Sequence, residues 1–198
     1  RLIAFSSVGH MGFVLFGIST LSPVGINGAL YANIAHGLIT GLLFFLVGAV
    51  KDRHHTADID VLGGGLYERT PRLGGLLAFA AVASLGLPGL AGFWGEMLVL
   101  LGAFRPDPAL SRGYYLVLMA LAGVGVVLTT TYFVKVLRRV AQGTSFQAWK
   151  EAVLLRDATT HELAVWSPVV ALVVVLGLWP GFLLDATTPV VHRLLGGG

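Results

Sequence analysis

Apolar residues occupy this chain in long runs that short polar segments separate. The first two runs, 2–21 and 26–50, are divided by a turn of Ser, Pro and Gly, and two further runs cover 114–134 and 163–179. Each run is close to the roughly 20 apolar residues that a helix needs to cross a bilayer. The pattern predicts four membrane-spanning helices in these segments.

A fifth apolar run, 73–104, is longer than one span requires and is interrupted near its centre by Gly86, Pro88 and Gly89. Proline cannot donate its backbone amide and clashes with the preceding turn, and glycine weakens a helix. In hydrocarbon, the backbone groups that such a break frees are tolerated only where protein encloses them or where they line a wet cavity. The run therefore predicts a discontinuous membrane helix.

Polar segments complete the predicted layout. Residues 51–72 are rich in charge and glycine and are expected to form a loop in water. Residues 140–155 show a weak amphipathic pattern, typical of a helix that lies on the surface or packs on a partner. The run 163–179 follows Thr159-x-x-Glu162, the pattern of a capping box. The fold class expected is an all-α integral membrane protein, a single bundle over 1–198 with about five spans, one of them discontinuous.

Composition agrees with a membrane protein. Hydrophobic residues make up 56% of the chain and charged residues only 12%, whereas soluble domains are about 25% charged. The chain has no cysteine, which excludes disulfides, iron–sulfur clusters and thiolate metal sites within it. A net charge of +3 could suggest nucleic acid, but the basic residues lie at the ends of apolar runs, so membrane topology accounts for them.

The basic residues also predict an orientation. With five crossings, most of them fall on the side of Arg1, and the positive-inside rule makes that side cytoplasmic and leaves the C-terminus outside. The cytoplasmic side would hold Lys51, Arg53, Arg69, Arg72, Lys135, Arg138, Arg139, Lys150 and Arg156, and the outer side Arg105, Arg112 and Arg193.

Glu96 is the only acidic or basic residue between Leu73 and Phe104, and it follows the break by one or two helical turns. One interpretation is an acid near a helix end that reaches the lipid headgroups. At about 1.5 Å per residue, however, Glu96 lies roughly 12 Å from Phe104, and glutamate has a short stem. Acids inside membranes are rare and usually face a bundle interior or an ion path, so Glu96 is a candidate functional residue.

Two histidines lie at depths comparable to that of Glu96, His10 in the first run and His36 in the second. Three protonatable groups on consecutive spans could pass protons through intervening water and hydroxyls, and Ser6 and Thr40 each lie one helical turn from a histidine. Alternatively, each histidine could be a neutral imidazole hydrogen-bonded across the bundle.

Cofactor and scaffold interpretations are also open at this point. No metal is expected, because His10, His36 and Glu96 lie on separate helices and show no local ligand spacing. His10 and His36 could serve as a bis-histidine axial pair for haem. A purely structural bundle that docks a partner does not explain a glutamate beside a helix break.

Three ordered motifs carry a resemblance to a known family. RLIAFSSVGHMGFVLFGI contains His10, IAHGLITGLLFFLVGAV contains His36, and SLGLPGLAGFWGEMLVLLGAF contains Glu96. Together they closely resemble the antiporter-like membrane subunits of proton-pumping NADH:quinone oxidoreductase, respiratory complex I. The resemblance covers most of residues 1–140 and is weaker beyond Arg139. It is greatest for the subunit M branch, whose late broken helix carries Glu where the others are expected to have Lys.

The resemblance implies a function and a setting. The chain would be the C-terminal portion of a fourteen-helix subunit of the bacterial inner (plasma) membrane, holding most of the second of two inverted repeats. His10, His36 and Glu96 match the family's central axis of proton transfer, with Glu96 near the exit half-channel. The chain would contribute to an H⁺-translocating enzyme without redox chemistry of its own, since NADH, flavin, iron–sulfur clusters and quinone would bind partner subunits.

The expected partners are the other membrane-arm subunits, the lipid bilayer and protons, and no nucleic acid. The alternative is a subunit of a Mrp-type multisubunit cation/proton antiporter, which shares these motifs.

Overall fold

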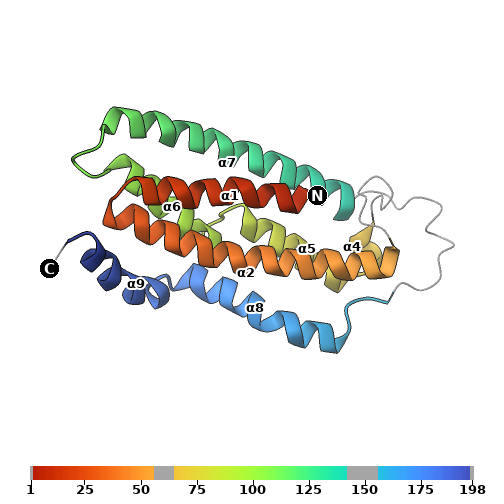
Figure 1. The fold of residues 1–198 in the computed structure, drawn as a ribbon. Helices are drawn as coiled ribbons and strands as arrows, with labels where there is room; N and C mark the ends of the chain where they lie inside the picture. Colours follow the sequence, from red (N-terminus) through yellow and green to blue (C-terminus); the bar gives the residue numbers. More distant parts are fainter. Residues whose placement is uncertain (1, 56–64, 142–155, 197–198) are drawn as a thin grey trace.

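The computed structural model of the chain (Figure 1) describes residues 2–55, 65–141 and 156–196, and all regular structure in these ranges is α-helical. The all-α fold class is therefore confirmed. In chain order the helices are α1 (Leu2–Ser19), α2 (Pro23–His54), α4 (Leu66–Arg69), α5 (Pro71–Ser84), α6 (Ala91–Phe104), α7 (Arg112–Ala141), α8 (Thr160–Leu178) and α9 (Gly181–Leu194).

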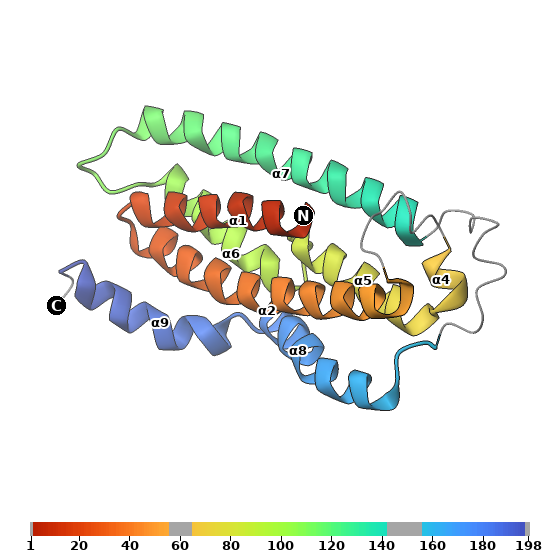
Figure 2. The ribbon, with the colours of Figure 1, turned by 45° about the vertical axis from the view of Figure 1, so that its right-hand side comes forward.

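Helix α2 is central to the bundle. It packs against α1, α5, α6, α8 and α9, and its buried face supplies much of the apolar core. Figures 1 and 2 show α7 along one edge and α8 with α9 along the opposite edge. One end of the bundle holds the α1–α2 turn, the α6–α7 loop and the C-terminus. The opposite end holds the end of α2 and the starts of α5 and α8.

Within the described ranges, α2, α7 and α8 are each long and apolar enough to cross a membrane alone. Helices α1, α5 and α6 are apolar but shorter. Helices α5 and α6 run through the bundle as two halves, with residues 85–90 between them, and together they form the predicted discontinuous span. The chain is a multi-pass membrane protein.

Two segments differ from the expected layout. The polar connection 51–72 is partly helical, because α2 continues to His54, α4 forms one turn, and α5 begins at Pro71. Its middle part, 56–64, lies outside the described residues. The predicted surface helix 140–155 lies almost entirely outside them as well, since only its first two residues are described and these end α7.

The tail after Trp179 is a further difference. Residues 181–194 form α9, and Trp179 and Pro180 separate it from α8, so a second helix is interrupted. Apolar and polar residues alternate at helical spacing along α9, and Pro180 precedes its first turn, where proline is tolerated.

Two side chains donate hydrogen bonds to backbone carbonyl oxygens at this second interruption. Pro180 has no N–H to donate to the carbonyl oxygen of Leu176, four residues earlier, and the buried hydroxyl of Tyr31 donates to that oxygen instead. Trp94 Nε1 donates to the carbonyl oxygen of Gly177 at 2.8 Å. Protein side chains thus satisfy two of the backbone carbonyls at this interruption.

Small residues bring α2 and α6 into close contact. A Cβ added to Gly28 would lie 2.6 Å from the backbone nitrogen of Val99, and one added to Gly95 would lie 2.6 Å from the Cα of Ala32. Such backbone approach is characteristic of packed membrane helices. Because Gly95 immediately precedes Glu96, this contact fixes the position of the acid beside α2.

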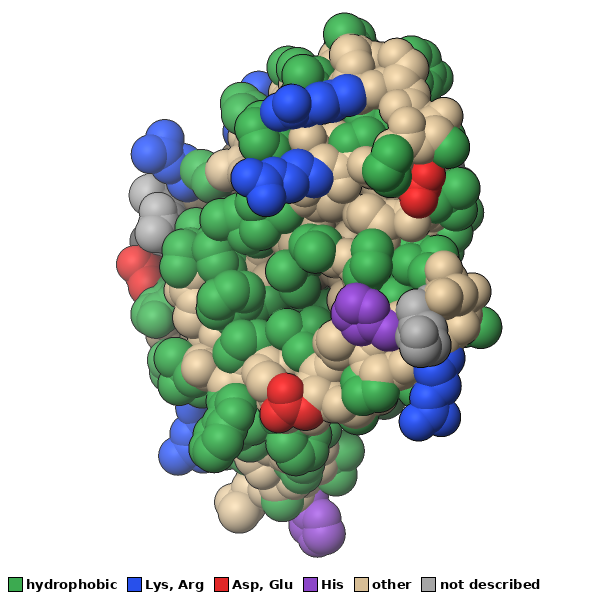
Figure 3. Space-filling view, turned by 90° about the vertical axis from the view of Figure 1, so that its left-hand side faces the viewer, with side chains coloured by type: hydrophobic (Ala, Val, Ile, Leu, Met, Phe, Trp, Pro, Cys, Tyr) green, Lys and Arg blue, Asp and Glu red, His purple; other side chains and the backbone are tan. Residues whose placement is uncertain are grey.

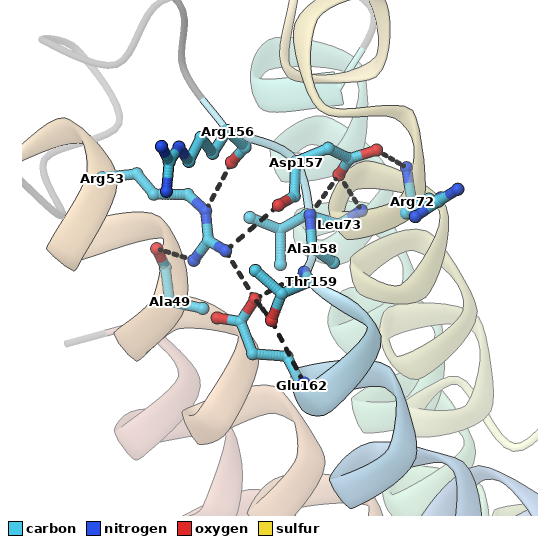
Figure 4. Close-up of polar contacts among 9 residues, drawn as sticks. All are labelled: Ala49, Arg53, Arg72, Leu73, Arg156, Asp157, Ala158, Thr159 and Glu162. Carbon is cyan, nitrogen blue, oxygen red and sulfur yellow. Dashed lines mark hydrogen bonds and ion pairs between the residues drawn. The ribbon is translucent and has the colours of Figure 1, made fainter.

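A polar cluster joins three helices at the end of the bundle where α8 begins (Figure 4). Arg53, in the last turn of α2, donates to the carboxylate of Glu162 at 2.7 Å and to the carbonyl oxygen of Arg156 at 2.8 Å. Thr159 and Glu162 form the predicted capping box at the start of α8.

Asp157 extends this cluster to the broken helix. Its carboxylate accepts hydrogen bonds from the N–H groups of Arg72 and Leu73 in the first turn of α5, at 3.0 and 3.1 Å. Partial burial alone would raise the pKa of Asp157, but hydrogen bonds from the backbone of Arg72, Ala158 and Leu73 hold it below the usual value. The polar cluster therefore anchors the first half of the broken helix to α2 and α8.

Candidate functional site

The three residues singled out in the sequence meet at one place. His10 of α1 lies between His36 of α2 and Glu96 of α6. The ring centroids of the two histidines are 5.0 Å apart, and Nδ1 of His10 lies 3.5 Å from Oε1 of Glu96. The side chains of His10 and Glu96 are 15% and 16% exposed. The side chains of His36, His10 and Glu96, in this order, form a continuous line of titratable groups, which we call the row.

The break between α5 and α6 shapes the surroundings of Glu96. The Glu96 side chain folds back toward Gly86, so that a Cβ added to this glycine would lie 2.6 Å from Oε2. Gly86 has a φ of +66°, a left-handed conformation that residues with a Cβ atom disfavour. The interruption thus does two things: it ends α5, and it leaves space for a carboxylate.

Hydroxyl groups contact both imidazoles. Ser7 Oγ lies 3.0 Å from Nε2 of His36, and Thr40 Oγ1 lies 3.1 Å from its Nδ1. Ser84, the last residue of α5, lies 3.2 Å from Nε2 of His10. Each histidine is therefore held by hydroxyls as well as by its neighbours in the row.

One of the two hydroxyls expected from the sequence has a different role. Thr40 contacts His36 as its spacing predicted, but Ser6 donates to the carbonyl oxygen of Ile3 at 2.7 Å. The expected pairing of Ser6 with His10 is wrong, because a serine inside a helix readily bonds to the preceding turn of its own backbone.

Sequence reasoning missed Ser7 and Ser84. Ser84 did give a signal, since it is the only hydroxyl-bearing residue from Leu73 to Phe104. Ser7 gave none, because its partner His36 lies on another helix and 29 residues away.

Two cavities adjoin the row. A cavity of about 20 Å³ is bounded by His10, His36, Ser84 and Glu96 among its lining residues. A larger cavity of about 360 Å³ lies between α1, the α5–α6 break and α7, and His10, Ser84 and Glu96 line it too. The smaller volume is enough for one water molecule, which polar groups on several sides could hold.

The space around the histidines bears on the haem alternative. The cavity that both histidines line has a volume of about 20 Å³, far smaller than a porphyrin, and both imidazoles already have hydroxyl partners, so the two histidines do not fit the axial positions of a haem. Among the described residues, no cluster of three His, Asp or Glu side chains has the arrangement of a metal site.

Charge is distributed unequally between the ends of the bundle. At the end of the bundle that holds the polar cluster, the last turns of α2 and α7 carry four basic residues, Lys51, Arg53, Arg138 and Arg139. Figure 3 views the opposite end, where hydrophobic side chains lie among backbone and other side chains, with basic, acidic and histidine side chains scattered between them.

Comparisons with known proteins agree with this description. The family described as NADH:quinone oxidoreductase/Mrp antiporter, TM, matches residues 1–129. The chain is 38% identical to NAD(P)H-quinone oxidoreductase chain 4 of Parasynechococcus marenigrum, over 99% of this chain and 36% of the relative. It is also 38% identical to NADH-quinone oxidoreductase subunit M of Rhodobacter capsulatus, over 98% of this chain and 36% of the relative. The chain thus spans little more than a third of the length of these relatives.

Solved structures share the fold. A chain of respiratory complex I from Thermus thermophilus with bound NADH superposes with a TM-score of 0.85 and 28% identity, over 99% of this chain and 39% of that one. A chain of the Mrp complex from a Dietzia species superposes with a TM-score of 0.73 and 19% identity, over 98% of this chain and 42% of that one. The second likeness concerns the fold alone.

Proposed function

Since the chain belongs to the NADH:quinone oxidoreductase/Mrp antiporter membrane family, we propose that it is part of a proton-translocating subunit of NADH:quinone oxidoreductase. In this proposal, His36, His10 and Glu96 carry the protons. The observation that supports it most strongly is the position of His10, whose ring lies beside that of His36 while its Nδ1 faces Glu96.

The transfer follows from the chemistry of the three groups. A neutral imidazole can accept a proton at one ring nitrogen and release one from the other, so its proton count is unchanged after each passage. A proton from His36, or from a water in the small cavity, reaches His10, and His10 gives a proton to the Glu96 carboxylate. The His10–Glu96 separation of 3.5 Å is long for a direct hydrogen bond, so a small shift of either side chain completes the path.

Release of the proton from Glu96 requires energy from outside this chain. Moving one charge against 100 mV needs about 2.3 kcal/mol. In the proposal, electron transfer in partner subunits supplies it through conformational or electrostatic changes along the membrane arm. NADH, flavin, iron–sulfur clusters and quinone bind those partners, and this chain contributes no redox group.

The charge asymmetry sets the proposed orientation. The end with the polar cluster and the basic last turns of α2 and α7 faces the cytoplasm, and the C-terminus faces outward. The membrane is the bacterial inner membrane, and its lipids and the neighbouring subunits surround the bundle.

The alternative, a subunit of a Mrp-type cation/proton antiporter, has less support. Relatives that are 38% identical over nearly the whole chain are named as quinone oxidoreductase subunits, whereas the Mrp likeness rests on 19% identity and fold.

Replacing the histidines tests the row. His10→Ala should reduce NADH-driven proton pumping several-fold, because His10 is the group between His36 and Glu96. His36→Ala should have a smaller effect, since Ser7 and Thr40 remain to hold water in its place. Pumping is measured as ACMA fluorescence quenching in inverted membrane vesicles that contain the whole complex, normalised to NADH oxidation.

The matched control is His192→Ala, which changes an exposed histidine in the last turn of α9. It should pump like the unmodified protein. Wild-type pumping by both the His10 and His36 variants would contradict a role for the row.

A further inference from the structure

Ser84 contacts the row at a point where its hydroxyl can control the chemistry of His10. It is the last residue of α5, immediately before the break, and only 5% of its surface is exposed. Its Oγ lies 3.2 Å from Nε2 of His10, a contact between residues 74 positions apart. The broken helix thus contacts His10 twice, through Ser84 before the break and through Glu96 after it.

The two contacts involve different nitrogens of one ring. Nε2 of His10 faces Ser84, and Nδ1 faces Glu96. A neutral imidazole carries one proton, which can reside on either nitrogen. An ionised carboxylate only accepts hydrogen bonds, whereas a serine hydroxyl both donates and accepts. The pairing of Ser84 with Nε2 therefore has a defined polarity whenever Glu96 is ionised: the hydroxyl donates to Nε2, and Nδ1–H points at the carboxylate.

We propose that Ser84 is a positioning residue that holds the His10 ring with Nδ1 toward Glu96, because its hydroxyl can donate to Nε2 or accept from it and so keeps this contact in both tautomers. Since the ring proton resides on the nitrogen that faces the ionised carboxylate, a fixed ring gives one tautomer, with its proton on Nδ1 and ready for transfer to Glu96. This proposal rests on the proposed function of the row. It assigns to the first half of the broken helix a part in the transfer that is distinct from that of Glu96.

The transfer from His10 to Glu96 conserves protons. The Nδ1 proton moves to an oxygen of Glu96, which becomes a neutral acid, while an incoming proton binds Nε2. The ring stays neutral overall and ends in the opposite tautomer, and the Ser84 hydroxyl then accepts from Nε2–H instead of donating. After Glu96 has released its proton, the ring gives its Nε2 proton to water and takes a proton from water at Nδ1, which restores the first tautomer, in which Ser84 again donates.

The cavities explain why a hydroxyl is needed at this position. Ser84 and His10 line both the small cavity and the larger one. Without the hydroxyl, Nε2 would face space that water can enter from either side, and a mobile water would not fix the orientation of the ring as a hydroxyl on α5 does. The same space leaves room for the additional methyl group of a threonine.

The test uses three variants in the complex that contains the full-length subunit. Ser84→Ala removes the hydroxyl, and Ser84→Thr keeps it. Ser167→Ala is the control, because Ser167 is exposed on α8 and its hydroxyl donates to the carbonyl oxygen of Ala164 in the preceding turn. Infrared difference spectra with and without ring-¹⁵N-labelled histidine report the tautomer, and ACMA quenching reports pumping.

We expect Ser84→Ala to lower pumping several-fold and to convert the His10 signal from one tautomer to a mixture. Ser84→Thr should restore both readouts, and Ser167→Ala should alter neither. An unchanged tautomer signal in Ser84→Ala overturns the proposal even if pumping falls, and so does a threonine variant that behaves like the alanine variant. These outcomes leave the proposed function intact provided that replacement of Glu96 still stops pumping.

Discussion

Replacing Glu96 by Gln should remove most proton pumping while NADH oxidation continues. The amide has nearly the same size as the carboxyl group but cannot take up and release a proton. Glu96 ends the row, with its carboxylate beside Nδ1 of His10 and folded back against Gly86, and no other acid lies within the row to replace it. Groups that transfer protons contribute roughly 10²–10⁴-fold to a reaction, so a decrease of about tenfold or more is expected.

ACMA quenching normalised to NADH oxidation in inverted vesicles measures this effect. Glu96→Asp keeps the acid but shortens the side chain, and it should retain partial pumping. Glu68→Gln is the matched control, since Glu68 is an exposed acid in the one-turn helix α4. If Glu96→Gln pumps as many protons per electron as the unmodified complex, the proposed row is incorrect.

Gly86→Ala should disturb the same site through the backbone. The alanine Cβ would lie 2.6 Å from Oε2 of Glu96, closer than real contacts allow, and it would occupy a φ of +66°. The left-handed conformation alone costs about 1–2 kcal/mol for a residue with a Cβ. Either the carboxylate moves away from His10 or the break changes shape, and pumping should fall several-fold in both cases.

Gly123→Ala provides the comparison for this variant. Gly123 lies inside α7, and a Cβ there would meet nothing within 4 Å. Because alanine is a better helix former than glycine, stability should stay equal or rise slightly. The two variants are compared by thermal unfolding of the purified complex and by ACMA quenching. Equal pumping in both would mean that Gly86 does not shape the acid's position.

The general layout could be predicted because the membrane imposes it on the sequence. Uninterrupted apolar runs of about 20 residues have few alternatives to membrane helices, and Pro88 with its neighbouring glycines predicts a break wherever it occurs in such a run. The depth of His10, His36 and Glu96 follows from counting residues along their helices. Their proximity is therefore the part of the site that sequence spacing could anticipate.

Contacts that depend on helix rotation could not be predicted in this way. Residue counting does not determine which face of α1 meets α2, so the pairing of Ser7 with His36 was missed. Ser84 and Glu96 both reach His10 because the break brings the end of α5 beside the start of α6. The helix α9 was missed for a different reason, since its mixture of polar and apolar residues is unlike that of a membrane span.

If Glu96 carries protons, its carboxyl group changes protonation state during turnover, and infrared spectroscopy can detect that change. Difference spectra between resting and NADH-reduced complex, recorded with ¹³C-labelled glutamate, report the carbonyl stretch of protonated carboxylic acids. A Glu96 that takes up and releases protons should give a carbonyl band that appears or disappears on reduction, shifts with the label and is absent from Glu96→Gln. Spectra in which the Glu96→Gln variant has the same carboxylic acid bands as the unmodified complex would contradict it.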